Sequence, residues 1–140
     1  MSFVVDSSIA LTWCFEDEAT PAADSLLIRL TNDGAYAPSL WPLEVLNALA
    51  TAQRRGRITS EARQERLALL HELPIILDTE TAEQAWTITN LLAERHGLTL
   101  YDAAYLELAQ RLDLPLATLD ADLRRAANAI GVPLLGSLTN

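Results

Sequence analysis

The stretch that decides the fold is FVVDSS, residues 3–8, near the start of the chain. Its apolar run from Phe3 to Val5 has the length and character of a buried β-strand. The run ends at Asp6, a residue type that favours helix N-caps, and the apolar pattern resumes at Ile9. A buried strand that passes directly into a helix is the building unit of an α/β domain.

The same alternation of short apolar runs and longer helical segments continues along the chain. It predicts an α/β fold with a short, mostly parallel five-stranded sheet. The predicted strands are residues 3–5, 35–37, 75–77, 116–119 and 132–135. The predicted helices span about residues 20–32, 42–54, 59–72, 81–96, 99–112 and 120–130. Because 140 residues suit one domain and no linker or repeat interrupts them, residues 1–140 are expected to form a single domain.

Composition excludes several classes of function. The formal net charge is −9, and all ten basic residues are arginine. Without lysine the chain cannot form a Walker A loop, a Schiff-base enzyme or a phosphate-receiver domain. The single cysteine, Cys14, rules out a disulfide framework and a multi-thiolate zinc site. No apolar run approaches the roughly 20 residues of a membrane span, and no signal peptide is recognisable. We therefore expect a cytoplasmic protein with no membrane partner.

Four carboxylates lie where predicted strands lead into predicted helices. Asp6 follows the first strand and Asp120 the fourth, while Glu44 and Asp102 lie in the first turns of two helices. Ligands bind at the carboxyl edge of open parallel sheets, so these side chains are expected to converge there. Converging carboxylates repel one another without a cation, and oxygen ligands select Mg²⁺, with Mn²⁺ as a substitute. Two such ions about 4 Å apart can activate water and stabilise the leaving oxygen of a phosphodiester.

A structural interpretation of the same residues stays open. Each of the four lies at a predicted helix N-terminus, where acidic residues cap the helix or offset its dipole. Asp6 and Asp120 suit the N-cap position, and the stretch from Thr99 to Asp102 resembles a capping box. The residues taken one by one do not separate the two interpretations.

Four ordered motifs resemble those of PIN-domain nucleases. They are FVVDSS (3–8), PLEVLNAL (42–49), LYDAAYLELA (100–109) and LATLDADL (116–123), and each contains one of the four carboxylates. The resemblance spans essentially the whole chain and implies a PIN-like three-layer α/β/α fold. The size and lone domain are most similar to the VapC-type toxins of bacterial toxin–antitoxin pairs. The resemblance further implies a Mg²⁺-dependent endoribonuclease, a homodimer, and inhibition by a cognate antitoxin protein.

Roles for the acidic residues can be proposed one by one from this resemblance. Asp6, Asp102 and Asp120 are expected to be the main metal ligands. Glu44 is expected to bind the metal or its water, and it is the candidate general base. Asp122 is a fifth candidate ligand, for which a solvated acid in the first helical turn is an equal alternative.

Hydroxyls and arginines complete the predicted site. Ser7 and Thr118 are expected to orient carboxylates or contact phosphate, although helix capping is the stronger alternative for Ser7. Because the chain is acidic, local arginines must steer an RNA substrate. The candidates are Arg54, Arg55, Arg57, Arg124 and Arg125. The first three equally suit a solvated helix C-terminus.

Two other functions compete with the ribonuclease. One is a DNA nuclease of the same fold, although the flap nucleases of related fold carry helical insertions for which this chain has no room. The other is a catalytically silent PIN-like interaction module, which the presence of all four carboxylates argues against. A haloacid-dehalogenase-type phosphatase is excluded because Ser8 occupies its second aspartate position and lysine is absent.

Overall fold

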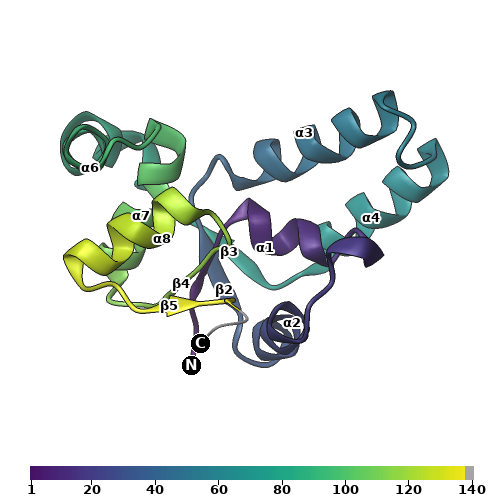
Figure 1. Cartoon of the computed structure of the whole chain (residues 1–140), viewed down its shortest axis with the longest axis horizontal. Coiled ribbons are helices and arrows are strands. Elements are labelled where there is room, and N and C mark those ends of the chain that lie inside the picture. Colours follow the sequence, from purple (N-terminus) through teal and green to yellow (C-terminus); the bar gives the residue numbers. More distant parts are fainter. Residues whose placement is uncertain (138–140) are drawn as a thin grey trace.

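A five-stranded parallel sheet forms the centre of the computed structural model, which describes residues 1–137 (Figure 1). The strands are β1 (Val4–Val5), β2 (Ala35–Ala37), β3 (Ile75–Leu77), β4 (Leu116–Ala117) and β5 (Leu134–Leu135). Their order is β3-β2-β1-β4-β5, and every neighbouring pair is parallel. Val4 of the central strand pairs with Tyr36 of β2 and Leu116 of β4. The predicted parallel sheet is confirmed. The single domain was expected over residues 1–140, and its last residues, 138–140, lie outside the described part of the chain.

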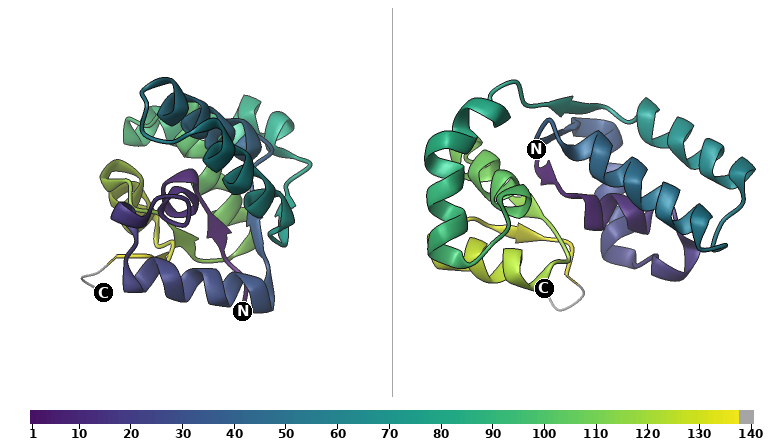
Figure 2. Two further views of the ribbon diagram at one scale, coloured as in Figure 1. Left: turned by 90° about the vertical axis from the view of Figure 1, so that its right-hand side faces the viewer. Right: turned by 90° about the horizontal axis from the view of Figure 1, so that it is seen from above.

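Helices cover the sheet on both sides and complete a three-layer α/β/α arrangement. On one side α3 and α4 lie antiparallel, and on the other α6, α7 and α8 form a second group (Figures 1 and 2). The helical segments are α1 (Ser7–Thr12), η1 (Glu16–Glu18), α2 (Pro21–Asp33), α3 (Trp41–Arg54), α4 (Ser60–Glu72), α5 (Thr81–Gln84), η2 (Ala85–Thr89), α6 (Asn90–His96), α7 (Leu100–Leu112) and α8 (Ala121–Ile130).

Local chemistry sets the ends of these helices. The hydroxyls of Thr20, Thr59 and Thr99 each accept a 3.1 Å hydrogen bond from a backbone N–H near the start of α2, α4 and α7. Such caps satisfy N–H groups that lack an intrahelical partner. Helix α2 ends at Gly34, whose φ of 74° is a left-handed conformation that favours glycine. These signals explain why the predicted starts of the helices agree with the structure.

Three predicted elements differ from the structure in kind or by more than one residue at an end. The helix expected over residues 81–96 contains a π-helical turn, η2, between α5 and α6. A π turn bonds each residue to one five positions away, so it interrupts the regular helical face. The strand expected over 116–119 ends at Ala117, because the chain turns toward α8 where the Thr118 hydroxyl accepts a 3.0 Å hydrogen bond from the Asp120 backbone N–H. The strand expected over 132–135 shortens to β5, since Pro133 has no N–H to donate to the ladder.

Helix α7 runs through the centre of the core. Its residues from Ala103 to Ala109 are all buried, and Tyr105, Leu106 and Leu108 are among the largest fully buried side chains. The helix packs against β1, α6 and α8. Its body is therefore fixed in the interior, while its first turn presents Asp102 at the carboxyl edge of the sheet.

Every helix in residues 1–137 is too short or too polar to span a bilayer.

Candidate active site

The acidic residues lie near the carboxyl edge of the sheet, three of them where a strand leads into a helix. Asp6 follows β1, and Asp120 lies between β4 and α8. Glu44 is in the first turn of α3, which follows β2, and Asp102 is in the first turn of α7. Because all five strands are parallel, the three strand–helix junctions share one edge. Helix α7 follows α6, and the charges of Asp120 and Asp122 act on Asp102 in its first turn.

Asp102 is the carboxylate that couples the others. Burial is the first cause of the raised pKa of Asp6 and of Glu44, and the negative charge of Asp102 raises both pKa values further. Burial, followed by the charges of Asp120 and Asp122, raises the pKa of Asp102 itself. The structure thus brings the five acidic side chains singled out from the sequence into one electrostatically coupled group.

Asp6 is the most buried member of the group, with 4% of its surface exposed. Thr118 Oγ1 donates to Asp6 Oδ2, Ser8 Oγ donates to Oδ1 at 2.6 Å, and the Ile9 backbone N–H donates to Oδ1 at 3.1 Å. Burial raises the pKa of Asp6 to about 6 despite these bonds. The expectation for Thr118 agrees with this geometry. The serine that orients Asp6 is Ser8 and not Ser7, which was expected from the sequence.

Glu44 has a partner that sequence reasoning missed. The hydroxyl of Tyr105 donates to Glu44 Oε1, and the tyrosine is 1% exposed. Burial, and then the negative charge of Glu44, raise the pKa of Tyr105, so its hydroxyl remains a donor. The available signal was spacing, because Tyr105 lies three residues after Asp102 and so shares its helical face.

Capping accounts for only part of the acidic group. Asp6 caps α1, and Asp120 caps α8 by accepting a 3.0 Å bond from the second backbone N–H of that helix. Helix α7 is capped by Thr99, which accepts from the backbone N–H of Asp102. Helix α3 has no side-chain cap. Capping therefore explains neither the Asp102 carboxylate nor that of Glu44.

The chain matches the PIN domain over residues 3–129, which is most of its length. The chain belongs to the PIN-domain family. Ribonuclease VapC1 of Mycobacterium tuberculosis is 35% identical to this PIN domain over 118 residues, which cover 82% of the chain and 84% of VapC1.

Solved structures resemble this PIN domain along nearly its whole length. VapBC2 from Rickettsia felis, bound to a DNA fragment from its promoter, matches with a TM-score of 0.68 and 16% identity over 98% of this chain and 99% of that one. VapC20 of M. tuberculosis, a sarcin-ricin loop cleaving toxin, matches with a TM-score of 0.61 and 17% identity over 90% and 95%. At such identities the likeness shows the fold.

The donor chemistry of the PIN domain's acidic group fits a hard divalent cation. The side chains offer oxygen atoms only, and their charges disfavour one another's ionised forms, which a cation reverses. In residues 1–137, no three acidic, histidine or cysteine side chains lie close enough together to form a ready-made metal cluster. Mg²⁺ commonly binds through one or two carboxylates and keeps several waters, so it does not require a closed cage.

Two of the arginines singled out from the sequence have structural partners. Arg57 pairs with Asp17 and Glu18 at 2.9 and 2.7 Å, and its guanidinium lies 3.8 Å from the centroid of the Phe15 ring. Arg124 Nη1 donates to the backbone carbonyl of Thr118 at 2.7 Å and so fixes the end of β4. These contacts hold the two guanidinium groups in place within the protein.

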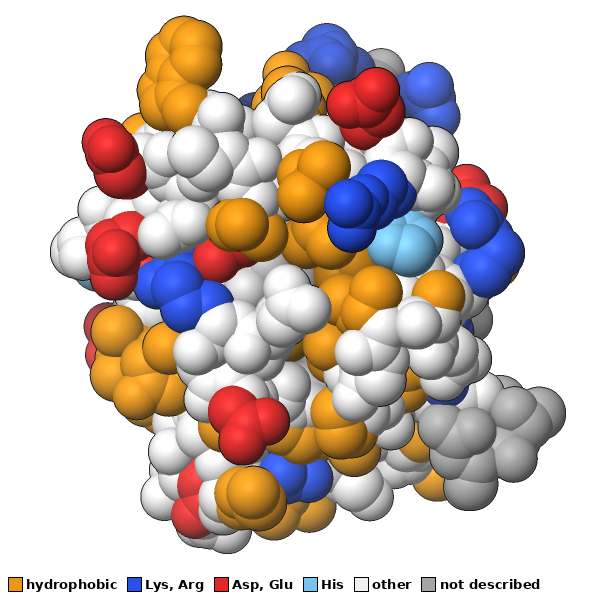
Figure 3. All heavy atoms as spheres, turned by 90° about the vertical axis from the view of Figure 1, so that its left-hand side faces the viewer, with side chains coloured by type: hydrophobic (Ala, Val, Ile, Leu, Met, Phe, Trp, Pro, Cys, Tyr) orange, Lys and Arg blue, Asp and Glu red, His pale blue; other side chains and the backbone are white. Residues whose placement is uncertain are grey.

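The other three candidate arginines are exposed, and so is Arg57. Arg54 donates to Thr51 at 3.1 Å, Arg125 pairs with Asp122 at 3.3 Å, and Arg55 follows α3 at the surface. Figure 3 views the molecule from the α6 side, where arginines lie scattered among acidic and apolar side chains. On this face they do not merge into a continuous basic surface.

Proposed function

We propose that this PIN domain is a divalent-metal-dependent endoribonuclease that acts as the toxin of a toxin–antitoxin pair. The observation that supports it best is the acidic group around Asp102, in which four motif carboxylates share the carboxyl edge of the sheet. Two comparisons agree with this proposal. VapC1 of M. tuberculosis is named a ribonuclease, and VapC20 is described as a toxin that cleaves the sarcin-ricin loop.

The metal proposed is Mg²⁺, with Mn²⁺ as a substitute. A divalent ion polarises a phosphodiester and lowers the pKa of the attacking water. Asp6, Asp102 and Asp120 are the proposed main ligands. Glu44 is proposed to bind the metal or its water, and Asp122 is an outer carboxylate. Their oxygen-only donor set favours hard cations over zinc or copper.

The protein's own groups orient the reaction. Thr118 and Ser8 hold both oxygens of Asp6, so this carboxylate keeps one orientation at the end of β1. Tyr105 holds Glu44 Oε1, which leaves Oε2 to accept a proton from the attacking water. Glu44 is therefore the proposed general base.

The proposed partners are RNA, an antitoxin protein and a second copy of the chain. An arginine from the antitoxin would neutralise the acidic group and is a physically sensible inhibitor. The exposed side chains of Leu43 and Tyr101 line an open groove that also contains Glu44. Apolar surface of this kind suits a homodimer interface. If the chain forms a homodimer, size-exclusion chromatography with light scattering should measure a molecular mass twice that of the 15.3 kDa chain.

Cleavage assays with matched aspartate variants test the proposal. Wild type and Asp24→Asn should cleave RNA in Mg²⁺ or Mn²⁺ but not in EDTA, and Asp102→Asn should be inactive. Asp24 is the control because it is an aspartate in the first turn of a helix, as Asp102 is, but it is exposed. Cleavage that survives EDTA or Asp102→Asn would refute the metal mechanism. Equal cleavage of single-stranded DNA would favour the DNA nuclease, and no cleavage at all would favour the silent module.

Expression in bacteria tests the toxin role. Wild-type protein should arrest growth, whereas Asp102→Asn should not. Co-expression of a small DNA-binding protein encoded next to this chain should restore growth. Unimpaired growth with an enzyme that is active in vitro would contradict the toxin role alone.

A further inference from the structure

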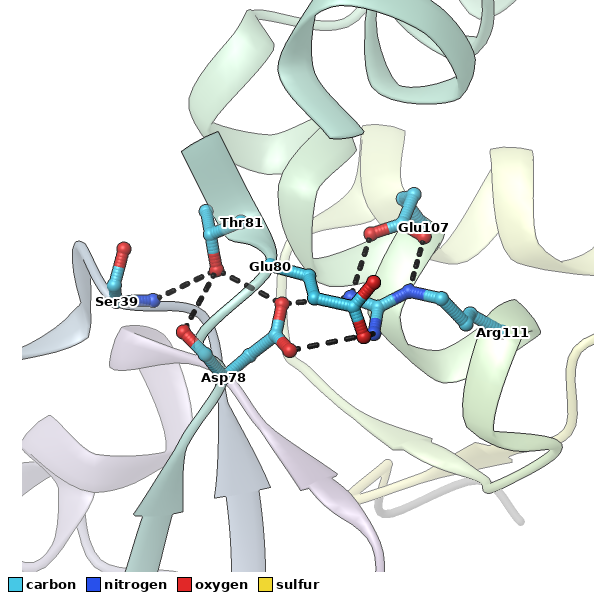
Figure 4. Close-up of polar contacts among 6 residues, drawn as sticks. All are labelled: Ser39, Asp78, Glu80, Thr81, Glu107 and Arg111. Atoms are coloured by element: carbon cyan, nitrogen blue, oxygen red, sulfur yellow. Dashed lines mark hydrogen bonds and ion pairs between the residues drawn. The ribbon is translucent and has the colours of Figure 1, made fainter. Parts of the chain in front are cut away.

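A second polar cluster lies outside the acidic group, between α7 and the carboxyl ends of β2 and β3 (Figure 4). Its members are Ser39, Asp78, Glu80, Thr81, Glu107 and Arg111. Arg111, in the last turn of α7, is at its centre. The guanidinium donates to both oxygens of Glu107 at 2.7 and 3.1 Å, and to both oxygens of Asp78 at 2.6 and 3.3 Å.

This cluster is shielded from water. The side chains of Glu107, Asp78 and Arg111 are 4%, 9% and 22% exposed. Removing charges from water is costly, so a buried ion pair often stabilises a protein no more than well-packed apolar residues would. It is better explained by the geometry that it fixes. Two buried carboxylates held by one planar guanidinium define a single arrangement of the segments that carry them.

A chain of hydrogen bonds extends the cluster to the helix of Glu44. Thr81 Oγ1 donates to Asp78 Oδ2 at 3.0 Å and accepts from the Ser39 backbone N–H at 3.0 Å. Ser39 lies in the loop from β2 into α3. The connection therefore runs from α7, the helix of Asp102, through the end of β3 to the start of α3.

The two connected helices belong to different packing groups. Helix α3 packs mainly against α1 and α4, whereas α7 packs mainly against η2 and α6 and also contacts α8, β1, β4 and α5. The hydrogen bond from Tyr105 to Glu44 joins the two helices directly. The chain from Arg111 to Ser39 adds a second, separate point of attachment between them.

We propose that this Arg111–Asp78–Thr81 network is a positioning device that sets the placement of Glu44 relative to Asp102. The inference rests on the proposed function, since it matters only if a cation and RNA bind between these carboxylates. Arg111, Asp78 and Thr81 would act by positioning other residues and would not contact the metal or the substrate.

Titration of the full chain with Mn²⁺ in a calorimeter measures metal affinity and so tests the inference. The most informative variant is Thr81→Val. This change removes the bridging hydroxyl and leaves every buried charge in place. Arg111→Gln removes the centre of the network, and Arg111→Lys restores its charge without the planar fork. Arg66→Gln is the control, because Arg66 is a half-buried arginine that ties α4 to the carbonyl of Cys14 at 2.7 Å, away from the network.

Thr81→Val and Arg111→Gln should each weaken Mn²⁺ binding by about tenfold or more, the range found for groups that orient metal ligands. They should lower kcat with an unchanged KM for RNA, and Arg111→Lys should recover part of the affinity. Arg66→Gln should lower the unfolding temperature but bind Mn²⁺ as the wild type does.

Two results would overturn the inference alone. One is a folded Thr81→Val that binds Mn²⁺ as the wild type does, and the other is an equal loss of affinity in Arg66→Gln. A wild-type protein that binds no Mn²⁺ would overturn the metal mechanism of the proposed function, and the inference with it. Thr81→Val keeps the test valid if Arg111→Gln fails to fold.

Discussion

At the scale of single residues, the hydroxyl of Tyr105 decides how Glu44 can act. Among the motif carboxylates, Glu44 lies on a helix without a side-chain cap, and its bond from Tyr105 comes from another helix. That bond lowers the pKa of Glu44 against the larger effect of burial, which raises it. The tyrosine therefore both orients the proposed base and favours its ionised form.

Tyr105→Phe should reduce kcat by about tenfold, because a hydrogen bond to a charged group contributes about 1.5 kcal/mol or more. Steady-state kinetics on an RNA substrate at saturating Mg²⁺ measure this effect. Tyr36→Phe, which changes a half-buried tyrosine of β2, should leave kcat unchanged. Equal losses in the two variants would point to a packing defect instead.

Asp102→Asn separates repulsion from capping. Burial and the neighbouring carboxylates raise the pKa of Asp102, so its charge opposes folding in metal-free buffer. Because Thr99 caps α7, the variant should unfold at the same or a higher temperature than wild type in EDTA. Mg²⁺ should raise the unfolding temperature of wild type but not of the variant. A clear loss of stability in EDTA would instead assign Asp102 a structural role.

At the scale of elements, the ion pairs of Arg111 tie α7 to the end of β3. Burial alone would raise the pKa of Asp78, but the bonds from Arg111, the Glu80 backbone N–H and Thr81 outweigh it and lower the pKa below 3.8. A carboxyl group with a lowered folded-state pKa stabilises the fold above its unfolded pKa. That contribution is lost as the pH falls through the folded value.

Urea unfolding of wild type and Asp78→Asn between pH 7 and pH 3 measures how much the ionised Asp78 contributes to the free energy of unfolding. The wild type should be more stable by a constant margin above about pH 5, where the carboxyl group is ionised in both states. The margin should shrink as the pH falls below 3.8, the ordinary value for this group. A margin that does not change with pH would mean that the ion pair contributes nothing to stability.

At the scale of the whole molecule, a net charge of −9 limits electrostatic attraction to RNA. Arg57 and Arg124 are held by partners within the protein, which leaves few arginines to contact phosphates. The proposed metal site then supplies much of the attraction at the scissile phosphate. Affinity for RNA should therefore depend on shape and on the cation more than on a basic surface.

The KM for single-stranded RNA should rise by less than about tenfold between 50 and 200 mM salt, as expected for about two phosphate contacts. Cleavage kinetics at fixed Mg²⁺ measure the dependence. A rise of about a thousandfold would contradict this view. It would indicate an extended basic surface, such as one completed by a second copy of the chain.

Much of the fold follows from local signals in the sequence. The strand Ala35–Ala37 follows Gly34, the strand Ile75–Leu77 follows Pro74, and the helix from Ser60 follows its threonine cap. Each boundary depends on residues a few positions away, so the sequence predicts it. The π turn in Ala85–Thr89 was not predicted, because its residues follow ordinary helical spacing.

The sequence by itself determined which carboxylates form the acidic group of this protein. Three of its motifs lie where strands lead into helices, and a parallel sheet gathers such junctions at one edge. Only the tertiary structure decided which groups hold those carboxylates. Ser8 instead of Ser7, Tyr105 at Glu44, and Arg111 between Glu107 and Asp78 emerge only from the folded chain. The physical reason is the sequence separation of the residues that interact, since hydrophobic periodicity and helix caps depend on residues only a few positions apart. The Tyr105–Glu44 and Arg111–Asp78 hydrogen bonds instead join residues far apart in sequence, and packing alone brings these together.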